Sequence, residues 1–524
     1  MSSRFLTALC ALFIMLVCLP PIPHAIAEVR LPSIIGDNMV LQHGRKLPLW
    51  GWAQPGEEVT VTLGGTRCVS VAGADGRWML HLPPHQPGGP LEMTVAGRNT
   101  IKLRNVVFGE VWVCSGQSNM AWGVAGSATG AEITKMDYPN VRSFQMDTRP
   151  RETPLSDCIG GWRPANPKTV GEISAVGFWF ALKLHQTLKI PVGLINATRG
   201  ATWAEAWTQR EALTADPDYK PIFDRQRQFL ADWPRRKAEM EAALVKWKTE
   251  AEAARGRGRP EPPKPFEPRD EYDYYYQNFP GYMFNAGIAP VLPYGIRGAI
   301  WYQGEGNAGR AYQYRKLLPT MIGNWRALWG QGDFPFLIVQ LPNYMKVKPE
   351  PGESQWAELR EAQLQVSRAV KQSGIAVTID LGDAVDVHPR NKWDIGKRLA
   401  LLALGTVYGQ PIEYSGPVLD YASFQGEKVV LGFQHTAGGL VAGKVGSSGS
   451  LRGFAMAGSD RTFQWADARS DGNTVIVSSA KVAKPLAVRY AWAENPVCNL
   501  YNKAGLPASP FRTDDWPGCT VNNK

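Results

Sequence analysis

The feature that most constrains this chain is the alternation of short apolar runs with helical patterns between about residues 106 and 405. The apolar runs are rich in β-branched and aromatic residues, as strands buried on both faces of a sheet are. Such alternation is typical of βαβ units, whose parallel strands form one sheet with helices on both sides. We therefore expect an α/β fold. The expected strands are 106–113, 191–198, 297–303, 334–341 and 374–383, and the expected helices are 174–188, 314–329, 356–370 and 395–409.

The chain of 524 residues is too long for a single core, and its texture divides it into three parts. Residues 28–105 alternate short period-2 runs with Gly and Pro, which predicts a small antiparallel β-module. Similar runs return in 411–524 and predict a second β-module, which leaves 106–410 as the central domain. Within it, a charged helical stretch and a Pro-rich segment at about 209–275 predict an insertion.

The N-terminus, residues 1–27, has the pattern of a secretory signal peptide. Arg4 supplies a positive charge, an apolar run follows, and small residues at Ala25 and Ala27 precede a cleavage site before Glu28. The apolar run is short for a membrane span and is closed by prolines. We therefore expect an exported protein, periplasmic or extracellular, without stable membrane insertion.

Five cysteines remain after the predicted cleavage, so at least one thiol is free or pairs between chains. Cys498 and Cys519, both in a loop-rich tail, are the most plausible disulfide. There is no CxxC, H-E-x-x-H or phosphate-loop motif, so we expect no metal and no cofactor. The net charge of +10 is spread along the chain, and we therefore expect no nucleic-acid partner.

Ser118 lies in "GQSNM", directly after the expected strand 106–113. In open α/β sheets, ligands bind at the carboxyl ends of the strands, which favours a nucleophile. A serine that merely caps the next helix is the alternative.

A serine nucleophile needs a base, and only His388 among the histidines follows an expected parallel strand. Asp386 and Asp383 precede it, and a carboxylate beside an imidazole fixes its tautomer. A loop histidine held by Asp386 is the alternative.

Two further strands end in polar residues at the same edge of the expected sheet. Ester hydrolysis passes through an oxyanion, which needs donors arranged in advance. The backbone N–H groups of Ser118 and Gly200 and the side-chain amide of Gln303 would supply them. Glu305 and Asn307 follow Gln303 closely, and we expect them to contact the substrate.

The chain resembles the sialate O-acetylesterase family, secreted carbohydrate esterases with a variant of the SGNH hydrolase fold. The resemblance covers nearly the whole chain after residue 28. The strings that carry it are "IIGDNMVLQ", "GEVWVCSGQSNM", "ATRGATWAEAW", "MFNAGIAPVLPYGIRGAIWYQGEGN", "DLGDAVDVHPRNKWDIGKRLA" and "AVRYAWAENPVCNLYNKAGLPASPFRTDDW".

The resemblance implies removal of O-acetyl groups from a glycan, with Ser118 as nucleophile, His388 as base, and Gly200 and Gln303 in the oxyanion hole. The family often has Gly-Gly where this chain has Gly200-Ala201. SGNH enzymes usually place the acid three residues before the histidine, where this chain has Val385. Asp386 is therefore our first choice for the acid and Asp383 the second, and a backbone carbonyl that orients His388 is the alternative.

The resemblance leaves the substrate open between an acetylated plant-type polysaccharide or oligosaccharide, which we favour, and O-acetylated sialic acid. The alternative of another class is a non-catalytic glycan-binding protein with a degenerate hydrolase core. The intact Ser118, His388 and Gln303 argue against it.

Overall fold

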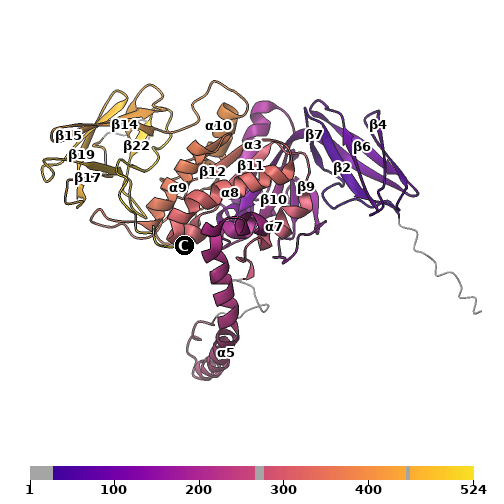
Figure 1. The fold of residues 1–524 in the computed structure, drawn as a ribbon, viewed down its shortest axis with the longest axis horizontal. Coiled ribbons are helices and arrows are strands. Elements are labelled where there is room, and N and C mark those ends of the chain that lie inside the picture. Colours follow the sequence, from indigo (N-terminus) through magenta and orange to yellow (C-terminus); the bar gives the residue numbers. More distant parts are fainter. Residues whose placement is uncertain (1–27, 266–275, 444–448) are drawn as a thin grey trace, which may run out of the picture.

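A computed structural model describes residues 28–265, 276–443 and 449–524. The predicted signal peptide, residues 1–27, and the last part of the predicted insertion, residues 266–275, lie outside the described residues. A central body of strands and helices carries one β-rich module at each end (Figure 1).

The central body is built on a sheet with the strand order β13-β12-β11-β7-β10-β8-β9. Every neighbouring pair from β13 to β8 is parallel, and only β9 joins in antiparallel fashion at the edge. The predicted α/β fold class is therefore confirmed, although β8 and β9 were not among the expected strands. The bounds are β7 Thr100–Gly116, β8 Tyr138–Met146, β9 Gly160–Ala165, β10 Val192–Thr198, β11 Gly298–Tyr302, β12 Phe336–Val339 and β13 Ser373–Ala376.

Helices cover both faces of this sheet. Trp112 of β7 packs edge-on against Phe180 on one face, with ring centroids 5.1 Å apart, and Trp301 of β11 packs against Trp325 at 5.9 Å. In the ladder Trp301 pairs with Ser115, so side-chain alternation places Trp301 and Trp112 on opposite faces. Accordingly, α3 and α10 pack together on the first face, and α8 lies with α9 on the second. The bounds are α3 Ala175–Leu188, α8 Ala311–Trp329, α9 Gln355–Ala369 and α10 Lys392–Thr406.

Strand β7 joins the N-terminal module to the central body. Its first half pairs with β1 and β6 of the module, and its second half pairs with β10 and β11. The predicted boundary at residue 105 thus falls inside one continuous strand. The module's other strands pair antiparallel, but β1 runs parallel to β7. The bounds are β1 Val40–Gln42, β2 Leu47–Trp52, β3 Glu58–Leu63, β4 Thr66–Val71, β5 Arg77–Leu82 and β6 Gly88–Ala96.

The C-terminal module has a hydrophobic cluster of its own, to which Val377 and Ile379 of the central body contribute. Its main sheets have the orders β14-β15-β20-β19 and β18-β17-β21-β23, and β16 pairs with β22. The bounds are β14 Val418–Gln425, β15 Lys428–Gln434, β16 Leu440–Ala442, β17 Phe454–Ala457, β18 Gln464–Trp465, β19 Asp467–Asp471, β20 Thr474–Ser478, β21 Ala487–Tyr490, β22 Leu500–Asn502 and β23 Phe511–Arg512.

The predicted disulfide between Cys498 and Cys519 is wrong, because all five cysteines after residue 27 are free. Cys498 packs against the hydrophobic cluster of the C-terminal module. The exposed Cys519 lies instead in the tail, where its backbone N–H donates to Glu358 of α9. Two cysteines in a loop-rich tail need not face each other, and here the fold sends them to different neighbours.

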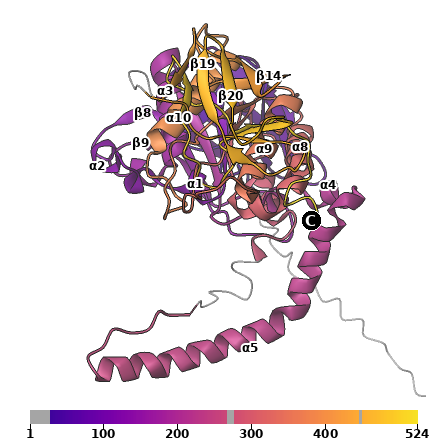
Figure 2. The ribbon, with the colours of Figure 1, turned by 90° about the vertical axis from the view of Figure 1, so that its left-hand side faces the viewer.

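The segment predicted as an insertion contains α4 (Arg210–Thr214) and the long helix α5 (Lys220–Gly256). Figures 1 and 2 show that α5 leaves the central body and projects away from it. Only four α5 side chains are buried: Ile222, Phe223, Phe229 and Ala251. Across the described ranges, no helix combines the length and apolarity that crossing a bilayer would require.

Candidate active site

Ser118 is placed by a sharp turn at the end of β7. Gly116 has φ +135°, and a Cβ at this position would overlap the Tyr302 carbonyl of the neighbouring strand. The chain then enters the one-turn helix α1 (Ser118–Ala121). Gln117 and Asn119 are buried and Ser118 alone is half-buried between them, so the turn presents only the serine outward. Ser118 begins α1 and caps no helix, which removes the capping interpretation.

His388 lies against this serine in a chain of three side chains. His388 Nε2 is 2.9 Å from Ser118 Oγ, and His388 Nδ1 is 3.1 Å from Asp386 Oδ1. A carboxylate only accepts, so the ring proton belongs on Nδ1, and Nε2 accepts from the Ser118 hydroxyl. Asp386 Oδ1 also accepts from the backbone N–H of His388 at 2.9 Å. That contact bends the loop back and brings Asp386 to the imidazole.

The Asp386 carboxylate remains open to solvent, because its side chain is 44% exposed and that of His388 is 26% exposed. The backbone N–H of His388 and then its imidazole lower the pKa of Asp386. Asp386 is thus ionised at neutral pH and oriented, although not enclosed as the buried carboxylate of a protease triad is.

Asp383, our second choice for the acid, does not contact His388. Its Oδ1 accepts from the backbone N–H groups of Val385 at 2.7 Å and Asp386 at 3.0 Å. These bonds lower the pKa of Asp383 and shape the turn that carries Asp386. The alternative assignment is therefore corrected: Asp383 builds the loop.

Gly200 follows β10 and lies beside the serine, since a Cβ added to it would be 3.5 Å from Ser118 Cβ. The Gly200 N–H has no hydrogen-bond partner among the described residues, and the Ser118 N–H, at the start of α1, has none within that helix. Ala201 has φ +57°, a left-handed conformation that favours glycine. This geometry explains why Gly-Gly suits the position where the present chain has Gly200-Ala201.

Gln303 was expected in the oxyanion hole, and its side chain is instead fully buried. Its Nε2 donates to the Thr202 carbonyl at 3.1 Å and to Asn307 Oδ1 at 2.7 Å, and its Oε1 accepts from Tyr314 at 3.0 Å. Both amide hydrogens are therefore used within the protein. The prediction that Gln303 donates to an oxyanion is wrong for this conformation.

Asn307 was expected to contact the substrate and is also buried, with 1% of its surface exposed. Its Oδ1 accepts from the backbone N–H of Ala204, and its Nδ2 donates to Glu205 at 2.8 Å. Gln117 holds the loop in this inward position, because its Oε1 accepts from the N–H groups of Gly304 and Gly306. Asn307 thus ties two loops together instead of facing a ligand.

Glu305, the other residue expected to contact the substrate, turns its carboxylate toward the turn that carries Ser118. Its Oε1 accepts from Asn119 Nδ2 at 2.6 Å, and Oε2 is buried with no hydrogen-bond partner within the described ranges. Burial raises the pKa of Glu305, and the contacts with Asn119 and Lys392 oppose that shift. The expectation of a direct substrate contact is therefore corrected.

Trp122 and Lys392, which the sequence did not single out, adjoin the Ser118–His388 pair. The Trp122 ring stacks on the His388 ring, with centroids 5.1 Å apart and planes inclined by 27°. Lys392 is fully buried, and its Nζ donates to Asn119 Oδ1 at 2.5 Å. Lysine side chains are mostly exposed, so the residue type alone predicts a surface position for Lys392. Its position four residues after His388 is the one sequence signal for a place in the site.

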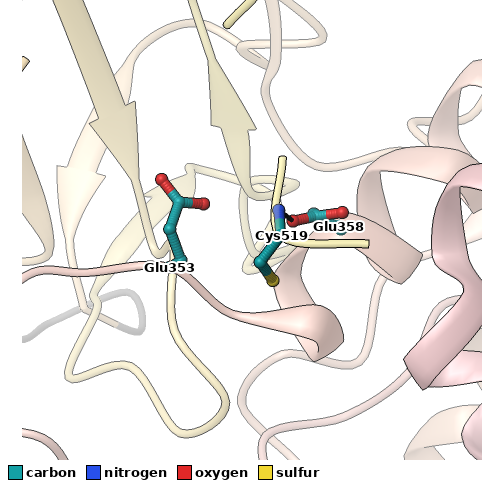
Figure 3. A group of neighbouring side chains, drawn as sticks. All are labelled: Glu353, Glu358 and Cys519. Carbon is teal, nitrogen blue, oxygen red and sulfur yellow. Dashed lines mark hydrogen bonds between the residues drawn. The ribbon is translucent and has the colours of Figure 1, made fainter. Parts of the chain in front are cut away.

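Among the described residues, one group of potential metal ligands lies away from this site, formed by Glu353, Glu358 and Cys519 (Figure 3). The Glu358 carboxylate accepts from backbone N–H groups of the C-terminal tail, and Glu353 forms an ion pair with Arg489 at 2.8 Å. Burial and the neighbouring Glu358 raise the pKa of the Cys519 thiol to about 12. Both carboxylates are thus already engaged by partners within the protein, as side chains in a structural contact are.

A serine hydroxyl hydrogen-bonded to a carboxylate-paired histidine, at the carboxyl edge of a parallel sheet, is the arrangement of a serine ester hydrolase. Comparison with known proteins agrees. Residues 277–404 match the family described as carbohydrate esterase, sialic acid-specific acetylesterase. The sialate O-acetylesterases of Mus musculus and Homo sapiens are 28% and 27% identical, over 92% and 94% of this chain and 94% of each relative.

The crystal structure of a carbohydrate acetylesterase from Xanthomonas citri is similar in both sequence and fold. It is 35% identical and superimposes with a TM-score of 0.79, over 93% of this chain and 100% of that one. The chain belongs to the sialate O-acetylesterase family and is a carbohydrate O-acetylesterase, a carboxylic ester hydrolase.

Proposed function

We propose that Ser118 attacks the acetyl carbonyl of an O-acetylated sugar and that His388 is the general base. The observation that carries the proposal is the 2.9 Å contact between Ser118 Oγ and His388 Nε2. The hydroxyl proton passes to Nε2 while Oγ bonds to the carbonyl carbon. The imidazolium then returns that proton to the sugar oxygen, which leaves as the free hydroxyl. Water, activated by the same imidazole, releases acetate from the acetyl-serine.

The oxyanion of each tetrahedral intermediate needs donors that are in place before the reaction. We assign this role to the backbone N–H groups of Ser118 and Gly200. Their support is the closeness of Gly200 to Ser118 and the unpaired Gly200 N–H. Asp386 orients the imidazole and stabilises its protonated form.

The site of action and the substrate are further parts of the proposal. The signal-peptide pattern of residues 1–27 supports export to the periplasm or the medium. We favour an acetylated plant-type polysaccharide or oligosaccharide over O-acetylated sialic acid. The identity to the bacterial carbohydrate acetylesterase is higher than that to the mammalian sialate O-acetylesterases, which supports a carbohydrate other than sialic acid.

The test is acetate release by wild type, Ser118→Ala and Ser127→Ala. Ser127 is a matched control, because it is also half-buried and its hydroxyl only donates to the Val124 carbonyl. With an aryl acetate, Ser118→Ala should lose on the order of 10⁴- to 10⁶-fold in turnover, and Ser127→Ala should match wild type. Activity in Ser118→Ala above a tenth of wild type would refute the mechanism.

The same assay with acetylated xylan, xyloglucan, pectin and sialosides ranks the substrates. A plant-type glycan should be deacetylated fastest. Faster release from a sialoside would refute the substrate preference and leave the serine mechanism standing. A wild-type protein that binds these glycans and releases no acetate would instead be a glycan-binding protein.

A further inference from the structure

Asn119, the residue directly after Ser118, connects three separate segments of the site. Its Nδ2 donates to Glu305 Oε1 at 2.6 Å and to the Val387 carbonyl at 3.0 Å, and its Oδ1 accepts from Lys392 Nζ at 2.5 Å. Val387 directly precedes His388. One buried amide thus links the turn that carries the nucleophile to the loop that carries the base.

The direction of this amide is fixed by the two charges on either side of it. An amide oxygen accepts and an amide nitrogen donates, so Oδ1 must face the Lys392 ammonium and Nδ2 must face the Glu305 carboxylate. A flipped amide would place donor against donor and acceptor against acceptor in a buried site, where unsatisfied charges are costly. With the amide so directed, Nδ2 is also held against the Val387 carbonyl.

Lys392 has no access to water and lies among aromatic rings. Its Nζ is 5.9 Å from the centre of the Trp122 ring and 5.6 Å from that of Tyr302, and its side chain is 0% exposed. Burial lowers the pKa of Lys392 to about 7, while Glu305 and Asp386 act to raise it. Burying a charged side chain away from water is costly, so solubility does not explain a lysine at this position.

We infer that Lys392 is a positioning residue for the acyl transfer, acting with Glu305 through Asn119 to hold His388 in line with Ser118. The inference rests on the proposed roles of Ser118 and His388. Lys392 does not touch the reacting atoms. It fixes the Asn119 amide, and the amide fixes the backbone one residue before the base.

The first test compares Lys392→Met with Lys397→Met, a matched control on the exposed face of the same helix. With an aryl acetate, Lys392→Met should lose about 10²-fold in kcat with KM changed only a few-fold, since a misplaced catalytic group costs about that much. Lys397→Met should match wild type. An unchanged kcat in Lys392→Met would overturn the inference.

Lys392→Met also leaves a buried carboxylate without its counter-charge, which destabilises the fold. The double variant Lys392→Met/Glu305→Gln removes both charges. It keeps the inference testable if the single variant does not fold. Its melting temperature should return toward that of wild type, and its kcat should stay low because Asn119 Oδ1 still lacks its donor. If both the melting temperature and kcat recovered, Lys392 would only balance the charge of Glu305, and the inference would be overturned.

The pH dependence of kcat/KM is a second test, because a merely structural role of Lys392 would leave it unchanged. The ionisable groups that face Lys392 are Glu305 and Tyr302 from the β11 side, and Asp386 from the loop before α10. His388 lies nearby, because its ring stacks on the Trp122 ring that Lys392 also approaches. Removing a nearby positive charge favours the imidazolium, so the acid limb of kcat/KM should move to higher pH in Lys392→Met. It should move to lower pH in Glu305→Gln. Profiles that stay in place in both variants would overturn the inference.

Failure of this inference is distinguishable from failure of the proposed function. If Ser118→Ala is inactive while Lys392→Met and the double variant retain wild-type kcat, the serine mechanism stands and the positioning role falls. An active Ser118→Ala would remove the basis of both.

Discussion

Two histidine–carboxylate pairs, one beside the middle of β7 and one beyond its carboxyl end, differ in their burial and in their further partners. His43 Nε2 is 2.6 Å from Glu110 Oε1 near the middle of β7, and His388 Nδ1 is 3.1 Å from Asp386 Oδ1 beyond its carboxyl end. Glu110 is 1% exposed and also accepts from Arg297, whereas the Asp386 side chain is 44% exposed. Of the two imidazoles, only that of His388 bonds a serine hydroxyl. The first pair joins the N-terminal module to the central sheet, and the second can move a proton.

Replacing the two histidines should produce the largest contrast. His388→Ala removes the proton acceptor and should lower turnover on the order of 10⁴- to 10⁶-fold, because members of a nucleophile–base unit act together. His43→Ala should leave kcat within a few-fold of wild type and lower the melting temperature. Acetate release and thermal unfolding of both variants measure the contrast. Loss of turnover in His43→Ala without loss of stability would break it.

Replacing the two carboxylates should separate stability from catalysis. Glu110→Gln should lower the free energy of unfolding by about 3 kcal/mol, because it removes one partner of a buried ion pair. This value is at the lower end of the usual range, since the Arg297 side chain is 35% exposed. Its kcat should be unchanged in the folded protein. Urea unfolding measures the first quantity and aryl acetate hydrolysis the second. A stability equal to wild type would contradict the structural role of the pair.

The pH dependence of stability should also come from the buried pair. Burial alone would raise the pKa of Glu110, but hydrogen bonds from His43 and Arg297 outweigh it and lower the pKa to about 2 from the usual 4.5. A carboxylate with a depressed pKa stabilises the folded state above its unfolded value and loses this contribution as pH falls toward about 2. Unfolding free energies between pH 5 and about 2 should therefore fall less steeply in Glu110→Gln than in wild type. Equal slopes would show that Glu110 is not the group that titrates.

Asp386→Asn should have a smaller catalytic effect than loss of a buried triad acid, because solvent already screens Asp386. We expect a loss of about 10²-fold in kcat, since the imidazole is still present but less often correctly turned. Asp383→Asn is the control, and it should stay within a few-fold because its contacts are to backbone N–H groups. A larger loss in Asp383→Asn would show that the loop, and not the carboxylate, orients His388.

Ala201→Gly should have the smallest effect. Ala201 has φ +57°, which costs a non-glycine residue about 1 kcal/mol, and glycine removes that cost while gaining freedom in the unfolded chain. The two effects oppose each other, so the free energy of unfolding should change by less than about 1 kcal/mol and kcat by a few-fold at most. A larger loss of kcat would show that Ala201 itself shapes the oxyanion region.

The sequence predicted five of the seven strands of the central sheet (β7, β10, β11, β12 and β13) and the Ser118–His388 pair. The pair follows from residues placed at strand ends. Parallel strands align their carboxyl ends at one edge, so Ser118, Gly200 and His388 meet there. Strands β8 and β9 lack a clear apolar period, because each is only partly buried and β9 lies at the edge of the sheet. The number of residues between a strand and a loop residue does not determine the direction in which the loop side chain points.

The residues after β11 illustrate that limit. Gln303, Glu305 and Asn307 were expected to face the substrate, yet the bonds from Gln117 turn their loop inward. The same packing buries Lys392, whose type predicts an exposed position. Both outcomes depend on contacts between segments far apart in the chain, which a pattern within one segment does not contain.

The most direct test of the central claim is to find the acetyl group on the enzyme. The protein is mixed with an aryl acetate, quenched in acid within a turnover and digested, and the acetylated peptide is located by mass spectrometry. We expect one acetyl group on the peptide that contains Ser118, absent from Ser118→Ala and formed far more slowly in His388→Ala. An acetyl group on another residue, or labelling of Ser118 in His388→Ala at the wild-type rate, would contradict it.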